Sequence, residues 1–406
     1  MRTLARKART RVATAAQGVA TAARPTPHFP VTSAATPRPD GWEGGALVSL
    51  TLVVFCLGLV EMYSASALKA VSEGLPAHFY VLKQLTAAVA GSVIAAILAR
   101  IDYRQLRLWA WPMLFAVVVM LVVVIAPGTQ AIAPVRNGAR RWLDLGISFQ
   151  PSELAKLVLI AWTAMMAVRK EDRLHSLSRG LTPFLVVWVP VVLLVFLEPN
   201  LSAALLIALL TSLVLFAGGA RIGHFIALGI VAVPVILAKL DDAPYRVKRI
   251  AAFLDPSGDT QGIAYQINQS LIAIGSGGLG GVGFGNSRQK YGFLPEAHND
   301  FLFSMIAEEW GLLGVAVVVA LFAAFAAVGY RIASRASDRF GYLLAVGMTN
   351  LIVVTAFLHM GVAMALLPTT GFTLPFMSYG GSALLTYFIA VGVLLSIARA
   401  AKATPR

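Results

Sequence analysis

The stretch LPEAHNDFLFSMIAEEWG gathers the acidic residues of this chain that are best suited to chemistry. Directly before an apolar run stand Glu296, His298 and Asp300, and within the run lie Glu308 and Glu309. Because a charge inside a membrane is costly, such residues mark either a functional site or a paired structural group. A carboxylate at the mouth of an apolar helix can act as a general base that removes a proton from a reacting hydroxyl group.

Asp300 is the first candidate for that role. Within about 40° of one another on a helix lie Asp300, Ser304, Ala307 and Gly311. This small, polar face is suited to line a cavity. The helix dipole at the first turn favours the ionised carboxylate, whereas burial favours the neutral acid. The residues alone support N-capping of the helix and catalysis about equally, so both interpretations stay open.

Other polar residues also fall inside apolar segments. Glu153 and Lys156 are three positions apart, a spacing that allows an ion pair on one helix face. A structural pair and a functional pair both fit this spacing. His359 stands in another apolar segment, and we interpret it as a hydrogen-bonded interior residue rather than a metal ligand.

Membrane-spanning helices must position these residues. Of the 406 residues, 58% are hydrophobic and only 13% are charged, about half the charged fraction of an ordinary soluble domain. Since a span needs about 20 apolar residues, the sequence predicts an all-α polytopic membrane protein. The ten predicted spans lie at 46–67, 81–99, 107–126, 152–168, 182–197, 200–218, 222–239, 302–329, 342–363 and 378–398.

Basic residues predict the orientation, because they are enriched in cytoplasmic loops. The N-terminal tail carries seven Lys or Arg residues, and placing it in the cytoplasm puts 21 of the 33 basic residues inside. With an even number of spans, both termini are then cytoplasmic. The net charge of +14 is therefore a topology signal. Nucleic-acid binding is not expected, because no basic patch is interleaved with aromatic residues on a soluble domain.

The predicted organisation is one membrane domain with two tails. Residues 1–45 are rich in Arg, Ala, Thr and Pro, a composition that favours a disordered cytoplasmic tail. The ten-helix domain covers 46–400, and 401–406 form a cytoplasmic C-terminal tail. The longest extracytoplasmic loop, 240–301, joins the seventh and eighth spans.

That long loop contains apolar stretches at 250–254 and 263–274, which predict short interfacial helices. Its segment GSGGLGGVGFG has seven glycines in eleven residues. No βαβ unit surrounds it, so it predicts a hinge or a close backbone approach rather than a dinucleotide site. Cys56 is the only cysteine and no histidine has ligand spacing, so no metal site of the protein's own is expected.

A second outer loop, residues 127–151, carries Arg136, Arg140 and Arg141. It lies on the extracytoplasmic side, where basic residues are under-represented. Each guanidinium offers a planar fork that suits phosphate oxygens, which predicts an anion site. The competing interpretation is interfacial snorkelling of the arginine side chains.

Four blocks occur in an order that resembles the SEDS family (shape, elongation, division and sporulation), which includes FtsW, RodA and SpoVE. The blocks are NGARRW at 137–142, QPSELAKL at 150–157, YQINQSLIAIGSGGLGGVGFGNSRQKYGFLPEAHNDF at 265–301 and PTTGFTLPFMSYGGSA at 368–383. The third block is most similar to the division-type branch represented by FtsW.

This resemblance implies a peptidoglycan glycosyltransferase that polymerises lipid II at the outer face of the cytoplasmic membrane, with β-1,4 linkages, during septal synthesis in cell division. It places the catalytic aspartate on Asp300, as the base for the attacking sugar hydroxyl. The leaving group is undecaprenyl pyrophosphate. Roles in binding the pyrophosphate or saccharide are assigned to Arg136, Arg140, Arg141, Glu153, Lys156, His298 and Ser378.

The resemblance also implies partners and surroundings. We expect a single-span class B penicillin-binding transpeptidase, other division proteins and membrane lipid as partners, and a location at the division septum of the inner membrane. A pyrophosphate donor is compatible with dependence on Mg²⁺ or Mn²⁺. The block at 368–383 is expected to shape the wall of a lipid-carrying groove opposite Asp300.

Two other functions fit parts of the sequence. The many spans and the polar residues within them also suit a flippase or transporter for lipid II. The basic tail and the long outer loop suit a non-catalytic scaffold of the division complex. Insensitivity to loss of Asp300 would favour either of these alternatives over the polymerase.

Overall fold

The computed structural model describes residues 41–136, 138–144, 146, 148–230, 249, 252–253 and 262–403, and the chain within these ranges is mainly helical. The long helices are α2 (Trp42–Ser72), α3 (Phe79–Arg100), α4 (Gln105–Ile125), α5 (Pro151–Arg169), α6 (Thr182–Leu197), α7 (Leu201–Ala217), α10 (Ile263–Gly277), α11 (Leu302–Ser334), α12 (Arg339–Ala363) and α13 (Gly381–Ala403). The short elements are η1 (Glu171–Arg173), η2 (Leu177–Leu181), η3 (Gln289–Tyr291) and the antiparallel strands β1 (Leu143–Asp144) and β2 (Ser148–Phe149).

The predicted all-α class is confirmed. In the described part of the chain, eight helices are long and apolar enough to cross a membrane, and α7 is a shorter apolar helix. The predicted span 222–239 begins as a helix at 222–230, and its remainder lies outside the described residues. The predicted interfacial helix at 263–274 is present as α10, whereas most of the stretch at 250–254 is not described.

The ends of the domain differ slightly from the predicted boundaries. Helix α2 begins at Trp42, inside the segment predicted as a tail, and residues 1–40 lie outside the described ones. Helix α13 continues to Ala403, past the predicted boundary at 400. The last three residues are not described.

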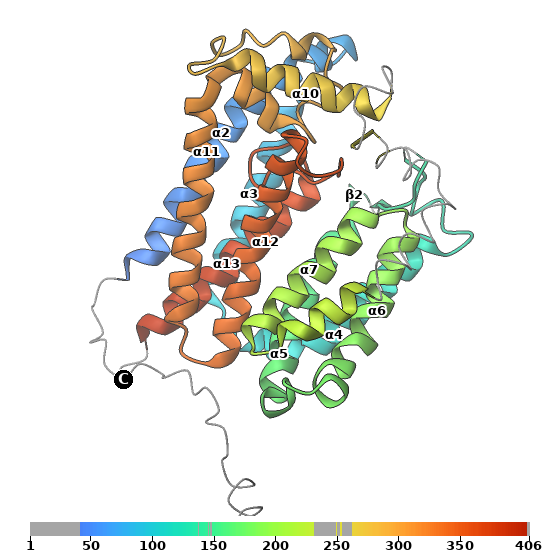
Figure 1. The fold of residues 1–406 in the computed structure, drawn as a ribbon, viewed down its shortest axis with the longest axis vertical. Helices are drawn as coiled ribbons and strands as arrows, with labels where there is room; N and C mark the ends of the chain where they lie inside the picture. The colour runs from blue at the N-terminus through green and yellow to red at the C-terminus, as the bar shows by residue number, and fades with distance from the viewer. Residues whose placement is uncertain are drawn as a thin grey trace, which may run out of the picture. The chain divides into compact units, whose positions relative to one another are not determined.

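Burial divides the helices into an inner and an outer set. Most of α5, α12 and α13 is buried within the protein, whereas α3, α4 and α6 turn most of their apolar residues outward. Helices that are apolar on their outward face suit lipid surroundings, because they satisfy their own backbone hydrogen bonds. Neighbouring pairs include α3 with α13, α2 with α11, and α10 with α11 (Figure 1).

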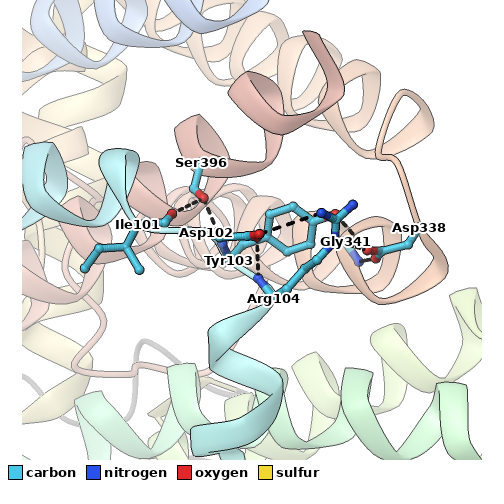
Figure 2. Close-up of polar contacts among 7 residues, drawn as sticks. All are labelled: Ile101, Asp102, Tyr103, Arg104, Asp338, Gly341 and Ser396. Atoms are coloured by element: carbon cyan, nitrogen blue, oxygen red, sulfur yellow. Dashed lines mark hydrogen bonds and ion pairs between the residues drawn. The ribbon is translucent and has the colours of Figure 1, made fainter. Parts of the chain in front are cut away.

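Polar contacts join the turn between α11 and α12 to the turn between α3 and α4. Asp338 caps α12 by accepting a hydrogen bond from the Gly341 N–H at 2.7 Å. It also accepts from the Tyr103 hydroxyl at 3.0 Å and from Arg104 Nε at 2.9 Å. Figure 2 shows these contacts together with Ser396, whose hydroxyl donates to the carbonyl of Ile101. The turns α3–α4 and α11–α12 are thereby joined.

Candidate active site

Asp300 lies in a turn before α11 rather than on the helix. The N-cap position is Phe301, and no side chain caps the first turn. The N-capping interpretation of Asp300 is therefore wrong. In the described residues, its carboxylate makes no side-chain hydrogen bond or ion pair.

The small face of α11 is packed rather than open, which corrects the predicted cavity lining. The Ser304 hydroxyl lies 2.6 Å from the Ser270 hydroxyl of α10. A Cβ added at Gly277 would stand 1.9 Å from the carbonyl oxygen of Ala307. Gly311 has φ +66° and breaks the helix where the glycine-rich segment approaches it. Of the four residues, Asp300 alone lies in front of the helix, which begins at Leu302.

The block at 368–383 reaches Asp300, and its role as the wall of a lipid-carrying groove stays a prediction. A Cβ at Gly371 would lie 4.0 Å from Asp300 Oδ2, so the backbone of this block passes close to the carboxyl group. The Arg249 side chain donates to the carbonyl oxygen of Thr369 at 3.1 Å. Among the described residues, the charged groups that act on Asp300 are Arg249 and Glu296.

These surroundings raise the pKa of Asp300 to about 7. Burial is the main cause, the negative charge of Glu296 adds to it, and the positive charge of Arg249 opposes both. A general base works best when its pKa lies near the operating pH. The carboxylate of Asp300 is thus able to accept and release a proton near neutrality.

His298 is buried, and it connects the sequence block at 265–301 to the block at 368–383. Its ring packs against Tyr80 and Tyr379, with centroids 4.9 Å and 5.9 Å away. Its carbonyl oxygen accepts from the Tyr379 N–H at 3.1 Å. Burial, assisted by the charge of Lys69, lowers the pKa of His298 to about 4, so the ring is neutral at pH 7. Its assigned role in substrate binding stays a prediction.

Ser378 is buried within the same block. Its hydroxyl accepts from the Leu374 N–H at 3.0 Å, and its carbonyl oxygen accepts from Gln84 Nε2 at 3.0 Å. The hydroxyl therefore stabilises a local turn. A contact between Ser378 and substrate stays a prediction.

Glu153 and Lys156 form the predicted ion pair on α5. Lys156 Nζ donates to Glu153 Oε1 at 2.7 Å, and the two side chains are only 2% and 12% exposed. The other carboxylate oxygen of Glu153 finds no hydrogen-bond partner among the described residues. His359 is likewise as predicted, with its Nδ1 2.7 Å from the carbonyl oxygen of Phe372.

The three arginines of the second outer loop bind acceptors of the loop and of its neighbours. Arg136 contacts Asp144 at 2.8 Å and the Ser148 hydroxyl at 2.9 Å. Arg140 and Arg141 donate chiefly to main-chain carbonyl oxygens: those of Ala126, Ala133, Glu198 and Pro199. These contacts give the arginines a role in shaping the loop, and their binding to pyrophosphate stays a prediction.

A cavity of about 250 Å³ lies beside Arg140 and Glu198. Its lining residues are Ile125, Val135, Gly138, Ala139, Arg140, Leu197, Glu198 and Pro199. Glu198 is buried, and burial raises the pKa of its carboxyl group to about 8 in spite of the nearby charge of Arg141. Asp300 is not part of this lining.

The acids inside α11 have structural partners that the sequence did not identify. Glu308 accepts from the Ser287 hydroxyl and from the Arg288 N–H. Glu309 accepts from the Ser64 hydroxyl of α2 at 2.7 Å and from the Gly285 N–H at 2.9 Å. The Glu309 carboxylate therefore holds the end of the glycine-rich segment against α11, and the Glu308 carboxylate holds the residues that follow this segment. Their position in an apolar run signalled buried partners, but nothing in the run identified which.

Among the residues that the structure describes, no group of three His, Cys, Asp or Glu side chains could hold a metal ion. Dependence on Mg²⁺ or Mn²⁺ stays a prediction.

Comparisons with known proteins extend over nearly the whole membrane domain. Residues 46–403 match the family model of FtsW, RodA and SpoVE, described as "Cell cycle protein". A "Probable peptidoglycan glycosyltransferase FtsW" of Trichlorobacter lovleyi is 41% identical over 360 residues, covering 88% of this chain and 94% of the relative. Stage V sporulation protein E of Bacillus subtilis is 38% identical over 354 residues, covering 87% and 96%.

Solved structures share the fold. A chain described under "Structural coordination of polymerization and crosslinking by a peptidoglycan synthase complex" has a TM-score of 0.73 and 29% identity, covering 87% of this chain and 96% of that one. The rod shape determining protein RodA of Thermus thermophilus has a TM-score of 0.63 and 28% identity, covering 87% and 95%. This chain is therefore a polytopic membrane protein that belongs to the FtsW, RodA and SpoVE family, as its four sequence blocks predict.

Proposed function

We propose that this protein is a peptidoglycan glycosyltransferase that polymerises lipid II into β-1,4-linked glycan strands. The observation that carries the proposal is the carboxyl group of Asp300, which is partly buried, unpaired among the described residues and raised in pKa to about 7. The relatives named FtsW support the same reaction, because they are 36–42% identical over most of the chain.

In the proposed reaction, the Asp300 carboxylate removes a proton from the sugar 4-hydroxyl of the acceptor. The hydroxyl oxygen then attacks the anomeric carbon of the donor, and the bond from that carbon to the pyrophosphate oxygen breaks. Undecaprenyl pyrophosphate leaves with the bonding electrons. Direct displacement inverts the α-linked donor to a β-linked product. Asp300 returns its proton to water before the next addition.

Auxiliary residues have binding rather than proton-transfer roles in this proposal. Lys156 is assigned to the pyrophosphate, and Glu153 is assigned to orient Lys156 or the second saccharide. The arginines at 136, 140 and 141 are further candidates for the pyrophosphate, since charge-assisted hydrogen bonds to phosphate are strong. His298 and Ser378 are assigned to the binding of the pyrophosphate or the saccharide.

We further propose that both termini are cytoplasmic and that Asp300 faces the outer side of the inner membrane, at the division septum. A class B penicillin-binding transpeptidase is the proposed partner. The solved complex that coordinates polymerization and crosslinking supports this partner class, because one of its chains shares the fold described above.

The test is a polymerisation assay with purified lipid II, with and without the transpeptidase, on the wild type and on Asp300→Ala. We expect glycan strands from the wild type and none from the variant, with equal recovery of monodisperse protein. Strands from Asp300→Ala at the wild-type rate would exclude the proposed base. Flipping of lipid II in vesicles without polymer, insensitive to Asp300, would indicate a transporter. Normal division with the acids of 294–309 neutralised would indicate a scaffold.

A further inference from the structure

The left-handed backbone conformation of Glu296 directs the chain toward Asp300. Glu296 has φ +54°, a conformation that non-glycine residues adopt at an energetic cost. Its carbonyl oxygen accepts hydrogen bonds from the N–H groups of Asn299 at 3.0 Å and Asp300 at 3.1 Å. The backbone position of Asp300 is therefore fixed directly by Glu296. Strained conformations of this kind persist only where the surroundings hold them, and they cluster at functional sites.

The side chain of Glu296 is held at both carboxylate oxygens. Lys69 Nζ, in the last turn of α2, lies 2.7 Å from Oε1. Asn299 Nδ2 donates to Oε2 at 2.6 Å. Lys69 thus anchors the turn to a long helix, and Asn299 closes the turn on itself.

Stability alone does not explain this ion pair. The side chains of Lys69 and Glu296 are 32% and 45% exposed, and ion pairs that are exposed to this degree contribute little to folding. Their effect is local, because the pair decides where the Glu296 turn and its charge lie.

That charge acts on Asp300. Glu296 is the negative group that raises the pKa of Asp300 beyond the effect of burial, and Arg249 opposes it. Burial raises the pKa of Glu296 itself, but the ammonium group of Lys69 and the hydrogen bond from Asn299 outweigh burial and bring this pKa below its ordinary value. Glu296 is therefore ionised at neutral pH. The titratable or charged groups described around Glu296 and Asp300 are Lys69, Glu73, Tyr80, Arg249, His298 and Tyr379.

We propose that Lys69 and Glu296 are a positioning pair for Asp300: the ion pair holds the left-handed turn that aims the Asp300 carboxyl group, and it sets the net charge that this group faces. The inference rests on the proposed role of Asp300 as the base. It assigns neither Lys69 nor Glu296 a contact with substrate.

The test compares Lys69→Met with Glu296→Gln in two measurements. The first is the rate of lipid II polymerisation against pH. The second is a titration of the Asp300 carboxyl band by infrared difference spectroscopy against Asp300→Asn. Lys69→Met leaves the Glu296 charge uncompensated, so the midpoint of the Asp300 titration moves to higher pH by about one unit. Glu296→Gln removes the negative charge, so the midpoint moves to lower pH. We expect both variants to lose about tenfold in rate at high pH, because the carboxyl group is misplaced.

Two further variants serve as controls. Lys69→Arg keeps the charge and is expected to retain the wild-type midpoint. Lys83→Met removes another lysine, on α3, whose Nζ lies 4.4 Å from the ring centroid of Phe79. It is expected to change neither the rate nor the midpoint.

The two measurements separate the pair from the polymerase. Equal carboxyl midpoints in wild type, Lys69→Met and Glu296→Gln would overturn the positioning pair, because a merely structural role lowers the rate without opposed shifts. Equal polymerisation by wild type and Asp300→Asn would overturn the proposed function, whatever the midpoints are.

Discussion

Glu153 and Asp300 are carboxylic acids near the N-terminal ends of two helices, and their surroundings are opposite. Glu153 is bound to Lys156 at 2.7 Å within the first turns of α5. Asp300 stands before α11 without a side-chain partner among the described residues, and its pKa is raised to about 7. The Glu153 carboxylate is held in place by its cation, whereas burial brings the pKa of the Asp300 carboxyl group close to neutrality. The difference supports our proposal that Asp300 transfers the proton and that Glu153 has a structural or orienting role.

Asp300→Asn gives the largest expected effect. Removal of a general base lowers the rate by about 10²–10⁴-fold, so we expect lipid II polymerisation to fall by at least two orders of magnitude. Glu153→Gln should retain more activity than Asp300→Asn in the same assay. An equal or larger loss from Glu153→Gln would reverse the roles of the two acids.

Asp300→Asn also has an expected effect on stability. Burial and Glu296 raise the pKa of Asp300 from 3.8 to about 7 in the folded protein. The folded state therefore binds a proton more tightly than the unfolded state, and stability is lost as pH rises through this window. Asparagine does not titrate. The Tm of Asp300→Asn in detergent should exceed the wild-type Tm more at pH 8 than at pH 5, and a constant difference would speak against a raised pKa.

Lys156→Met tests the paired acid. It leaves the Glu153 carboxylate buried without its cation, which costs about 3–5 kcal/mol in comparable buried pairs. We expect a clear loss of unfolding free energy in denaturant titrations. The double variant Glu153→Gln with Lys156→Met should recover most of it, because no isolated charge remains. A double variant as unstable as the single one would show that the pair is not the source of the loss.

The glycine-rich segment offers a smaller test, through a close backbone contact. Gly281 has φ +79°, and a Cβ there would lie 2.1 Å from the carbonyl oxygen of Glu309. Gly74 has φ +75° with open space around it, so Gly74→Ala measures the conformational cost alone, about 1–2 kcal/mol. Gly281→Ala should lower the unfolding free energy by a further 1–3 kcal/mol or so, through the steric overlap. Equal losses would mean that the segment moves away at no cost.

Arg136→Gln gives the smallest expected effect on stability. In its ion pair with Asp144, the two side chains are 44% and 38% exposed. Pairs exposed to this degree contribute about 0–1 kcal/mol to the free energy of unfolding. The change in Tm should therefore be small. A large rise in the KM for lipid II with an unchanged Tm would support pyrophosphate binding by this residue, whereas an unchanged KM would leave it a loop-forming role.

Much of the fold could be predicted because apolar spans have a fixed length requirement. The spans at 302–329 and 342–363 match α11 and α12 closely, and the spacing of Glu153 and Lys156 correctly gave their pair. Partners distant in sequence could not be predicted. Ser64 with Glu309, Lys69 with Glu296 and Gly371 beside Asp300 depend on how the helices pack. The packed face around Ser304 was mistaken for a cavity lining because small residues serve both purposes.

The dependence of the polymerisation rate on pH tests the central claim most directly. The initial rate from lipid II would be measured between pH 5 and pH 9 with purified wild-type protein at saturating substrate. A base that works as its carboxylate predicts a rate that is constant at high pH, half-maximal near the pKa of about 7, and falling tenfold per unit below it. A rate that stays constant down to pH 5 would contradict the assignment of Asp300 as a base with a raised pKa.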